Sequence, residues 1–262
     1  KAIAESNTDT AVDVFVYDTR KDSDGGAWRK RTQNTSWYNE ALNTSTRGAR
    51  KEFPSVAVVV AESTKVTIYD GDDPDMPMWM VFNGGGIIYA NETSSAYMLN
   101  GLLCTGNGFA TGVQLINFLS DSAKGYRSAS ATTYQGNWRS NIAGRNLSAT
   151  NWDGVAFNPT VVNGVVNDVA MTVLPNAPID ADTGLPVPTI AVATNGGVSI
   201  IKDDGTVVDI TNTQDSSTFN FCRDVQFRQP PKPTKTAIIY SVQSQLLTML
   251  LQLMPKEELR KM

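Results

Sequence analysis

Hydrophobic and polar positions alternate with a period of two along much of this chain, and glycine and aspartate interrupt the alternation at short intervals. The clearest stretch is TIAVATNGGVSIIKDDGTVVDI, residues 189–210. It predicts strands at 190–194, 198–201 and 206–210, because alternation bounded by turn residues is typical of hairpins. Asn195-Gly196-Gly197 would supply the positive φ angles of the first turn. Asp203-Asp204-Gly205 would form the second, with aspartate side chains capping their own backbone.

Similar phrases occur at three other places. Residues 55–82 and 98–127 repeat the order strand, turn, strand, turn, strand, and residues 14–28 match its second half. The comparable strands begin near Val14, Val66, Val113 and Val198, which gives intervals of roughly 52, 47 and 85 residues, and a period of roughly 40 to 50 residues is typical of propeller blades. We interpret the last interval as two periods, with a poorly matching copy near residue 155.

The sequence therefore predicts an all-β fold: a β-propeller-like domain of repeated four-stranded antiparallel blades, about four or five of them, in an incomplete ring. The predicted blade cores are 14–17, 56–60 with 66–69, 102–104 with 113–118, and 190–193 with 198–201. A β-sandwich with regularly spaced hairpins is the alternative. It would bring the hairpins at Val66 and Val198 face to face across one core.

The chain changes character at Gln229. We expect residues 1–228 to form the propeller-like domain, and residues 229–262 to form a Pro-rich spacer and a helical tail, with QPPKP extended and 241–254 helical. The uncharged run 236–254 has about 19 residues, near membrane-spanning length, but its glutamines and serines argue against a span. We expect a docked or partner-binding helix, and a shift of reading frame would also explain the break. We also expect the chain to be a fragment or the matured part of a longer protein.

Composition excludes several chemistries. The net charge of −4 gives no global electrostatic case for nucleic acid. The chain has no histidine, which excludes Ser-His-Asp and Cys-His catalysis and every His-ligated metal site. The two cysteines, Cys104 and Cys222, are read as buried thiols, with pairing as the alternative. The sequence assigns no catalytic, cofactor-binding or metal-binding residue, and the ligand-binding residues stay unknown.

An acidic turn, DGDDPDMPMW, gathers Asp70, Asp72, Asp73 and Asp75. Clustered carboxylates can hold calcium, but Pro74 occupies a ligand position of the EF-hand pattern. We therefore interpret the segment as an exposed acidic turn without a metal.

A polar and basic insert covers residues 28–53 and would join two blades. Its cations alternate with Trp28, Trp37 and Tyr38. The cations are Arg29, Lys30, Arg31, Arg47, Arg50 and Lys51. This mixture is suited to binding an anionic polymer or to stacking on sugars. The alternative is a solvated loop that docks on a neighbouring subunit.

The segment KDSDGGAW, residues 21–28, resembles the Asp-box hairpin of sialidase-like propellers. Gly25 and Trp28 fit that pattern, whereas Ser23 stands at the Asp position and Ala27 at the Thr position. The box is structural in that family, so the resemblance implies a propeller fold more than hydrolysis. A glycan hydrolase would also need two carboxylates brought together in space.

The phrases VDVFVYDTRKDSDGGAWRKRTQNTSWYNE and TSTRGARKEFPSVAVVVAESTKVTIYDGDDPDMPMWMVFNGGG resemble virion structural proteins of marine tailed bacteriophages, in particular propeller-bearing tail or baseplate-associated proteins. The resemblance covers about the first 225 residues, carries no catalytic motif, and implies a subunit assembled in a virus particle. We therefore expect a non-enzymatic structural or binding protein located in the virion. Its partners would be other virion subunits or the same protein, or a host-surface glycan, without cofactor, nucleic acid or membrane. The alternatives are a propeller glycan hydrolase and a lectin-like module that binds sugars through Trp28, Trp37 or Trp138.

Overall fold

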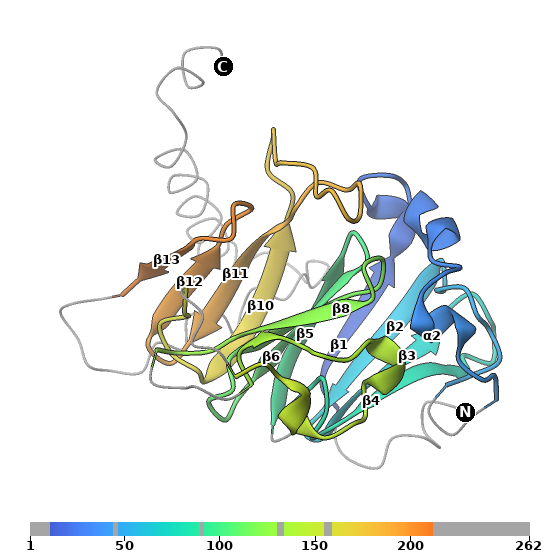
Figure 1. Cartoon of the computed structure of the whole chain (residues 1–262), viewed down its shortest axis with the longest axis horizontal. Coiled ribbons are helices and arrows are strands. Elements are labelled where there is room, and N and C mark those ends of the chain that lie inside the picture. Colours follow the sequence, from blue (N-terminus) through green and yellow to red (C-terminus); the bar gives the residue numbers. More distant parts are fainter. Residues whose placement is uncertain (1–10, 44–46, 90–91, 130–133, 155–158, 212–262) are drawn as a thin grey trace, which may run out of the picture. The chain divides into compact units, whose positions relative to one another are not determined.

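The computed structural model describes residues 11–43, 47–89, 92–129, 134–154 and 159–211 (Figure 1). The chain divides into two compact units, Lys1–Asn220 and Phe221–Met262, and all the described residues belong to the first. Strands predominate in it, so the predicted all-β class is confirmed. Within the described ranges no helix is long and apolar enough to cross a bilayer. The spacer and helical tail predicted for 229–262 lie outside the described residues, as does Cys222.

Three antiparallel sheets form the described structure, and each begins with a four-stranded meander. Sheet 1 contains β1 (Ala11–Asp18), β2 (Val56–Glu62), β3 (Lys65–Asp70) and β4 (Met78–Asn83). Sheet 2 contains β5 (Thr93–Leu99), β6 (Leu102–Asn107), β7 (Val113–Asn117), β8 (Ser122–Tyr126) and the two-residue β9 (Gly136–Asn137). Sheet 3 contains β10 (Val166–Thr172), β11 (Thr189–Thr194), β12 (Gly197–Ile201) and β13 (Val207–Ile210). In Figure 1, sheet 1 runs from blue to turquoise, sheet 2 is green, and sheet 3 runs from yellow at β10 to orange at β13.

Short helical turns connect the strands. Between β1 and β2 lie η1 (Thr19–Lys21), η2 (Ala27–Arg31) and α2 (Ser36–Asn39). After β9 come η3 (Ile142–Gly144) and η4 (Ala149–Asn151). None exceeds five residues, so the strands and their hydrophobic faces carry the fold.

The three sheets are joined through their first strands. β5 packs against β1 and β2, and β10 packs against β5 and β6. One hydrophobic cluster, which includes Trp79 and Phe118, lies between sheets 1 and 2, and a second, which includes Val113 and Val192, lies between sheets 2 and 3. Among the described strands, none of sheet 1 packs closely on sheet 3. The hairpins at Val66 and Val198 therefore do not face each other across one sandwich core.

Each first strand carries the same irregularity. The register with the second strand shifts between Ala11 and Asp13, between Thr93 and Ser95, and between Val166 and Asp168. The extra residue is the second of the strand in all three cases, which are the β-bulges at Val12, Ser94 and Asn167. The three sheets therefore repeat one structural unit in detail, and Asp13, Ser95 and Asp168 are equivalent positions.

The predicted blade at 14–17 was wrong as a separate unit. These residues lie in β1, and β1 pairs with β2 from Ala11↔Glu62 to Asp18↔Val56. The segments at Val14 and Val66 therefore belong to one sheet, and the described residues form three sheets instead of four or five blades. Alternation identified the strand correctly, but it carries no information about which strand is its partner.

The long interval between Val113 and Val198 was also misread. The described residues between β8 and β10 form β9, η3 and η4 and no additional four-stranded sheet. This interval is one repeat enlarged by a long insertion.

The hairpins of sheet 3 confirm the three strands predicted within 189–210. The turn geometry differs, because positive φ occurs at Gly197 (136°) and not at Asn195 or Gly196. The second turn follows the prediction. Gly205 has a φ of 80°, and the Thr206 N–H donates to the Asp204 carboxylate at 2.9 Å.

Candidate functional site

The insert 28–53, expected to be a binding loop between blades, is part of the hydrophobic core of sheets 1 and 2. Trp28, Trp37 and Phe53 are fully buried. The Phe53 ring lies 4.8 Å from the Trp79 ring and 5.1 Å from the Phe118 ring, between centroids. Buried indoles cannot stack on a sugar or a nucleobase, so the proposed roles of Trp28 and Trp37 in ligand stacking are wrong.

Most of the arginines of the insert are paired. Arg29 contacts Glu52 at 2.8 Å, and Arg31 contacts Asp24 at 3.3 Å. Arg50 contacts Asp70 at 2.8 Å and Asp72 at 2.6 Å. These carboxylates neutralise the basic segment locally, so it does not form the open cationic surface that the sequence suggested.

Arg47 is the arginine that shapes the insert itself. Its guanidinium is buried, donates to the carbonyl oxygens of Trp37, Arg50 and Lys51, and lies 5.3 Å from the Trp79 ring centroid. Burial lowers the pKa of Arg47 to about 10, so the group remains charged at neutral pH. One cation thus satisfies three carbonyl groups that have no ladder partner.

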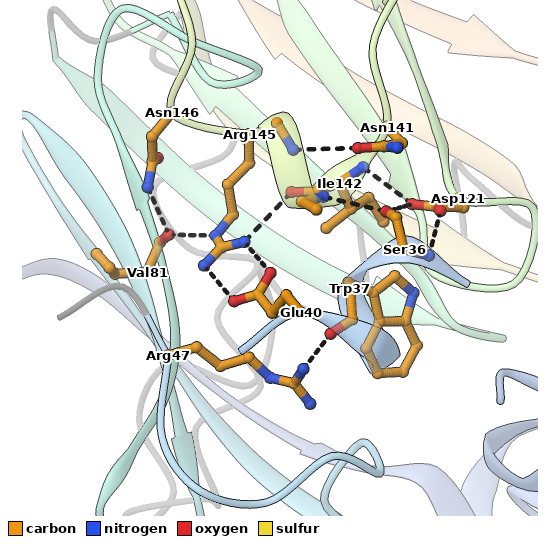
Figure 2. Close-up of polar contacts among 12 residues, drawn as sticks. Ser36, Trp37, Glu40, Arg47, Val81, Asp121, Asn141, Ile142, Arg145 and Asn146 are labelled. Atoms are coloured by element: carbon orange, nitrogen blue, oxygen red, sulfur yellow. Dashed lines mark hydrogen bonds and ion pairs between the residues drawn. The ribbon is translucent and has the colours of Figure 1, made fainter. Parts of the chain in front are cut away.

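A second buried arginine fixes the insert to the rest of the chain (Figure 2). Arg145 donates to both oxygens of Glu40, at 2.7 and 3.0 Å, and to the Val81 carbonyl oxygen at 2.9 Å. Asp121 accepts hydrogen bonds from the Ser36 N–H at 2.7 Å and from the Ile142 N–H at 2.9 Å. The insert, β4 and the η3 segment are therefore held in one network.

The Asp-box-like segment is built around Asp22. Its carboxylate accepts hydrogen bonds from the Tyr17 hydroxyl, from Trp28 Nε1 at 2.7 Å and from the Asn100 N–H at 2.8 Å. Burial raises the pKa of Asp22 and that of Tyr17. Tyr17, Asp22 and Trp28 are each at most 6% exposed. This Tyr–Asp pair is closed to a substrate and joins the ends of β1 and β5, which is a structural role.

The acidic turn also has a structural role. Asp72 accepts the N–H groups of Ser55 at 2.6 Å and Val56 at 2.9 Å, and it pairs with Arg50. Asp70 is buried rather than exposed. Burial raises the pKa of Asp70, and the charge of Arg50 opposes that rise. In the described part of the chain no group of three or more acidic or cysteine side chains is arranged to hold a metal ion.

A polar ladder links the equivalent positions of the three first strands. Asp13 Oδ2 accepts the Ala96 N–H at 2.9 Å and lies 3.3 Å from Ser95 Oγ. Ser95 Oγ donates to Asp168 Oδ1 at 2.8 Å and lies 3.4 Å from the Val169 nitrogen. Burial raises the pKa of Asp168, and the charge of Asp13 adds to the rise. Both carboxylates are used to join neighbouring strands.

One cluster that the sequence reading missed lies in the loops that follow β4, β6 and β8. The Tyr89 and Tyr134 rings are 4.1 Å apart, and the Arg127 guanidinium lies 5.6 Å from the Tyr134 ring centroid. Phe109 is 61% exposed in the neighbouring loop. Asn107 fixes that loop, since it accepts the Phe109 N–H at 2.8 Å and donates to the Tyr89 carbonyl oxygen at 3.0 Å. We call Tyr89, Phe109, Arg127 and Tyr134 the loop patch.

A signal for the loop patch was present in the sequence. Phe109 stands in TGNGFATG, where glycine and asparagine mark a turn and a large aromatic residue is out of place unless it is used at the surface. The tyrosines gave no such signal, because β-strands also favour them.

Trp138 and Cys104, which the sequence also singled out, are both buried. Trp138 is 5% exposed and packs on Trp152 with ring centroids 5.2 Å apart, so it offers no open face for the sugar stacking considered in the lectin-like alternative. Cys104 is a buried free thiol, and burial raises its pKa. A buried thiol with a raised pKa is a poor nucleophile.

Comparison with known proteins adds no assignment. Neither the protein-family models nor the curated proteins that were searched include a match to this chain.

Proposed function

We propose that this chain is a non-enzymatic structural and binding protein in which propeller-type blades hold loops on a rigid β scaffold. The observation that carries the proposal is the repeat of the first strands: β1, β5 and β10 share one bulge position, and each contacts the next. Blades of a propeller are four-stranded antiparallel meanders arranged in this serial way. The setting that fits the resemblance to phage proteins is a tail-associated subunit of a virion.

A scaffold role agrees with the way the acidic side chains are used. Asp22 and Asp72 bind backbone N–H groups or buried hydroxyl and indole groups of the same chain. Asp13 and Asp168 connect neighbouring strands. A glycan hydrolase needs two carboxylates that face an open cleft, whereas these four are occupied in holding the fold together.

The loop patch is the surface that we propose binds a partner, and the partner that it fits is a surface glycan. Aromatic faces pack on the apolar faces of sugar rings, and a close, tilted tyrosine pair with an exposed phenylalanine offers such faces at low entropic cost. Asn107 pins the Phe109 loop, so the patch is organised before it meets a ligand.

Binding to an array of immobilised bacterial surface polysaccharides tests this function. The wild-type protein should retain at least one polysaccharide, and Phe109→Ala should weaken that binding roughly tenfold, which corresponds to about 1.4 kcal/mol. Leu147→Ala is the matched control, because Leu147 is also exposed, at 52%, but lies between η3 and η4, outside the loop patch.

The same samples decide between binding and hydrolysis. Intact polysaccharide after long incubation is the expected result. Release of reducing sugar by the wild-type protein would contradict the non-enzymatic proposal, and equal losses in Phe109→Ala and Leu147→Ala would contradict the assignment of the patch.

A further inference from the structure

Each internal interface of this protein uses the same row of side chains, one from each strand of the earlier sheet. In sheet 1 the cross-strand partners that form this row are Phe15, Val59, Ile68 and Met80. In sheet 2 the corresponding partners are Tyr97, Cys104, Leu115 and Lys124. The row of sheet 1 contributes to the cluster between sheets 1 and 2, and the first three members of the second row contribute to the cluster between sheets 2 and 3. A row of this kind is therefore the surface on which the next sheet packs.

The next sheet meets that row with alternate residues of its first strand. Ala96 and Met98 in β5 are 3% and 1% exposed, and both belong to the cluster between sheets 1 and 2. Val169 and Met171 in β10 are 4% and 6% exposed, and both belong to the cluster between sheets 2 and 3. The two interfaces therefore join equivalent positions on both sides.

Sheet 1 has the same alternate residues in its first strand, but they are exposed. Counted from the shared bulge, the equivalents in β1 are Val14 and Val16, which are 54% and 60% exposed. Val12, at the bulge itself, is 49% exposed. We call Val12, Val14 and Val16 the valine strip. Among the described residues no sheet covers it, and an exposed apolar strip of this kind indicates a site of association.

Sheet 3 has the complementary row at the other end of the series. Its cross-strand partners are Ala170, Ala191, Ile200 and Val208. Val169 and Val192 face sheet 2, and successive side chains of a strand point to opposite faces, so this row points away from sheet 2. Ile200 is buried, the other three members are half-buried, and Ile210 on the same face is 39% exposed. Within the described ranges no other sheet packs closely on this face.

We propose that the valine strip of one molecule docks on the row of sheet 3 of a second copy, so that the protein associates head to tail. This contact would repeat between molecules the interface that joins sheet 1 to sheet 2 and sheet 2 to sheet 3. The small side chains of Ala170 and Ala191 leave room for the branched valines. Such an interface is heterologous, so successive copies form a closed ring or an open filament. The self-association rests on the proposed blade arrangement and adds a partner to it.

Size-exclusion chromatography with light scattering, on the full chain at several concentrations, tests the association. We expect the wild-type protein to have the mass of two or more chains. Val16→Asp and Ile210→Asp each place a charge where docking would desolvate it, and each should weaken association at least about tenfold. Both residues are exposed, and near-ultraviolet circular dichroism verifies that the variants keep the wild-type fold. Leu147→Asp is the matched control, because Leu147 is 52% exposed outside both surfaces, and it should associate like the wild-type protein.

A mixture of the two monomeric variants tests the head-to-tail geometry. Val16→Asp keeps an intact row on sheet 3, and Ile210→Asp keeps an intact valine strip. An equimolar mixture should therefore form a heterodimer that grows no further, although neither variant associates alone.

Three results would overturn the proposal. A wild-type protein that is monomeric at every concentration would show that a second copy does not cover the strip, which would then be covered by the same chain or by a different partner. Association of Ile210→Asp alone, with Val16→Asp monomeric, would show that the strip pairs with itself. Monomeric variants that form no heterodimer would exclude the head-to-tail contact. Polysaccharide retention by the same variants is a separate measurement, and its absence in all of them and in the wild-type protein would contradict the proposed function without affecting the self-association.

Discussion

At the scale of single residues, burial decides what the polar side chains of this protein do. Asp22, Arg47 and Arg145 look like surface charges in a loop-rich sequence, yet each is at most 6% exposed. A buried charge is tolerated only when it is paired and hydrogen-bonded. Asp22 and Arg145 meet that condition by binding residues that are distant in the sequence, Asn100 and Glu40 respectively, which is why a local pattern could not reveal them. Arg47 instead binds carbonyl oxygens within its own insert.

The Arg145–Glu40 pair gives the first prediction. Replacing Glu40 with Gln leaves the Arg145 guanidinium, whose side chain is 2% exposed, without its counter-ion. We expect a loss of about 3 kcal/mol in the free energy of unfolding, the lower end for a broken buried pair. Urea denaturation measures it. Arg20→Ala, which removes an exposed and solvent-screened pair with Asp18, should leave the free energy of unfolding nearly unchanged. Equal effects of the two substitutions would contradict the role of the network.

Asp168 gives a prediction for pH. Burial is the main cause of its raised pKa, so the folded state binds a proton more readily than the unfolded state. This contribution to stability is present when the pH is below the ordinary aspartate value, and it is lost as the pH rises through the raised one. Asp168→Asn cannot titrate. The wild-type protein should therefore gain stability relative to Asp168→Asn as the pH falls from neutral toward 4.

Urea unfolding of both proteins at several pH values provides the measurement. Asp204→Asn is the control with the opposite sign, because hydrogen bonds from Thr206 lower the pKa of Asp204 to about 2. A wild-type advantage over Asp168→Asn that stays constant, or that grows with rising pH, would show that Asp168 is not buried in the ladder.

At the scale of elements, strands were easier to predict than their partners. The hairpins of sheet 3 could be recognised from alternation and turn residues, because both signals are local. The pairing of β1 with β2 could not, since 37 residues, 19–55, separate the two strands and their pairing depends on the docked insert. The insert was misread for the same reason. Its tryptophans alternate with arginines, and only the fold shows that the indoles point inward, that Arg29, Arg31 and Arg50 meet carboxylates, and that a further arginine binds carbonyl oxygens.

The insert provides the third prediction. Trp37 packs on Trp79 and Phe118, with ring centroids 5.5 Å away in each case, and its indole donates to the Phe118 carbonyl oxygen at 2.8 Å. Trp37→Ala should destabilise the protein by about 3 to 5 kcal/mol, the usual cost of truncating a buried aromatic residue. Leu42→Ala in the same insert should be nearly neutral, because Leu42 is 39% exposed. Thermal unfolding that does not distinguish the two variants would mean that the insert is a solvated loop.

At the scale of the whole described unit, the informative feature is an apolar face that has no cover. Val14 and Val16 in β1 are 54% and 60% exposed, whereas their equivalents in β5 and β10 are at most 6% exposed. Sheet 1 covers the equivalent residues of β5, and sheet 2 covers those of β10. Among the described residues, no sheet covers the corresponding face of β1. Exposed apolar surface of this kind marks an interface. The regular spacing of similar strand segments along the sequence indicated repeated sheets. Only the structure shows which residues of each first strand face a neighbouring sheet.

The loop patch was the part of the candidate site least accessible to sequence reasoning. Its residues come from three separate loops, and the hydrogen bonds of Asn107 bring two of them together. Spacing along the chain carries no trace of that arrangement, apart from the unexpected Phe109 in a turn.

A crystal structure of the chain, at a resolution that resolves side-chain hydrogen bonds, tests the central claim most directly. The account predicts that β5 lies between β1 and β10 and contacts both. Asp13, Ser95 and Asp168 should be joined in one ladder, and each of the three strands should have its β-bulge at the second residue, Val12, Ser94 or Asn167. Packing of the Val66 and Val198 hairpins face to face across a single core, with the three first strands apart, would contradict it.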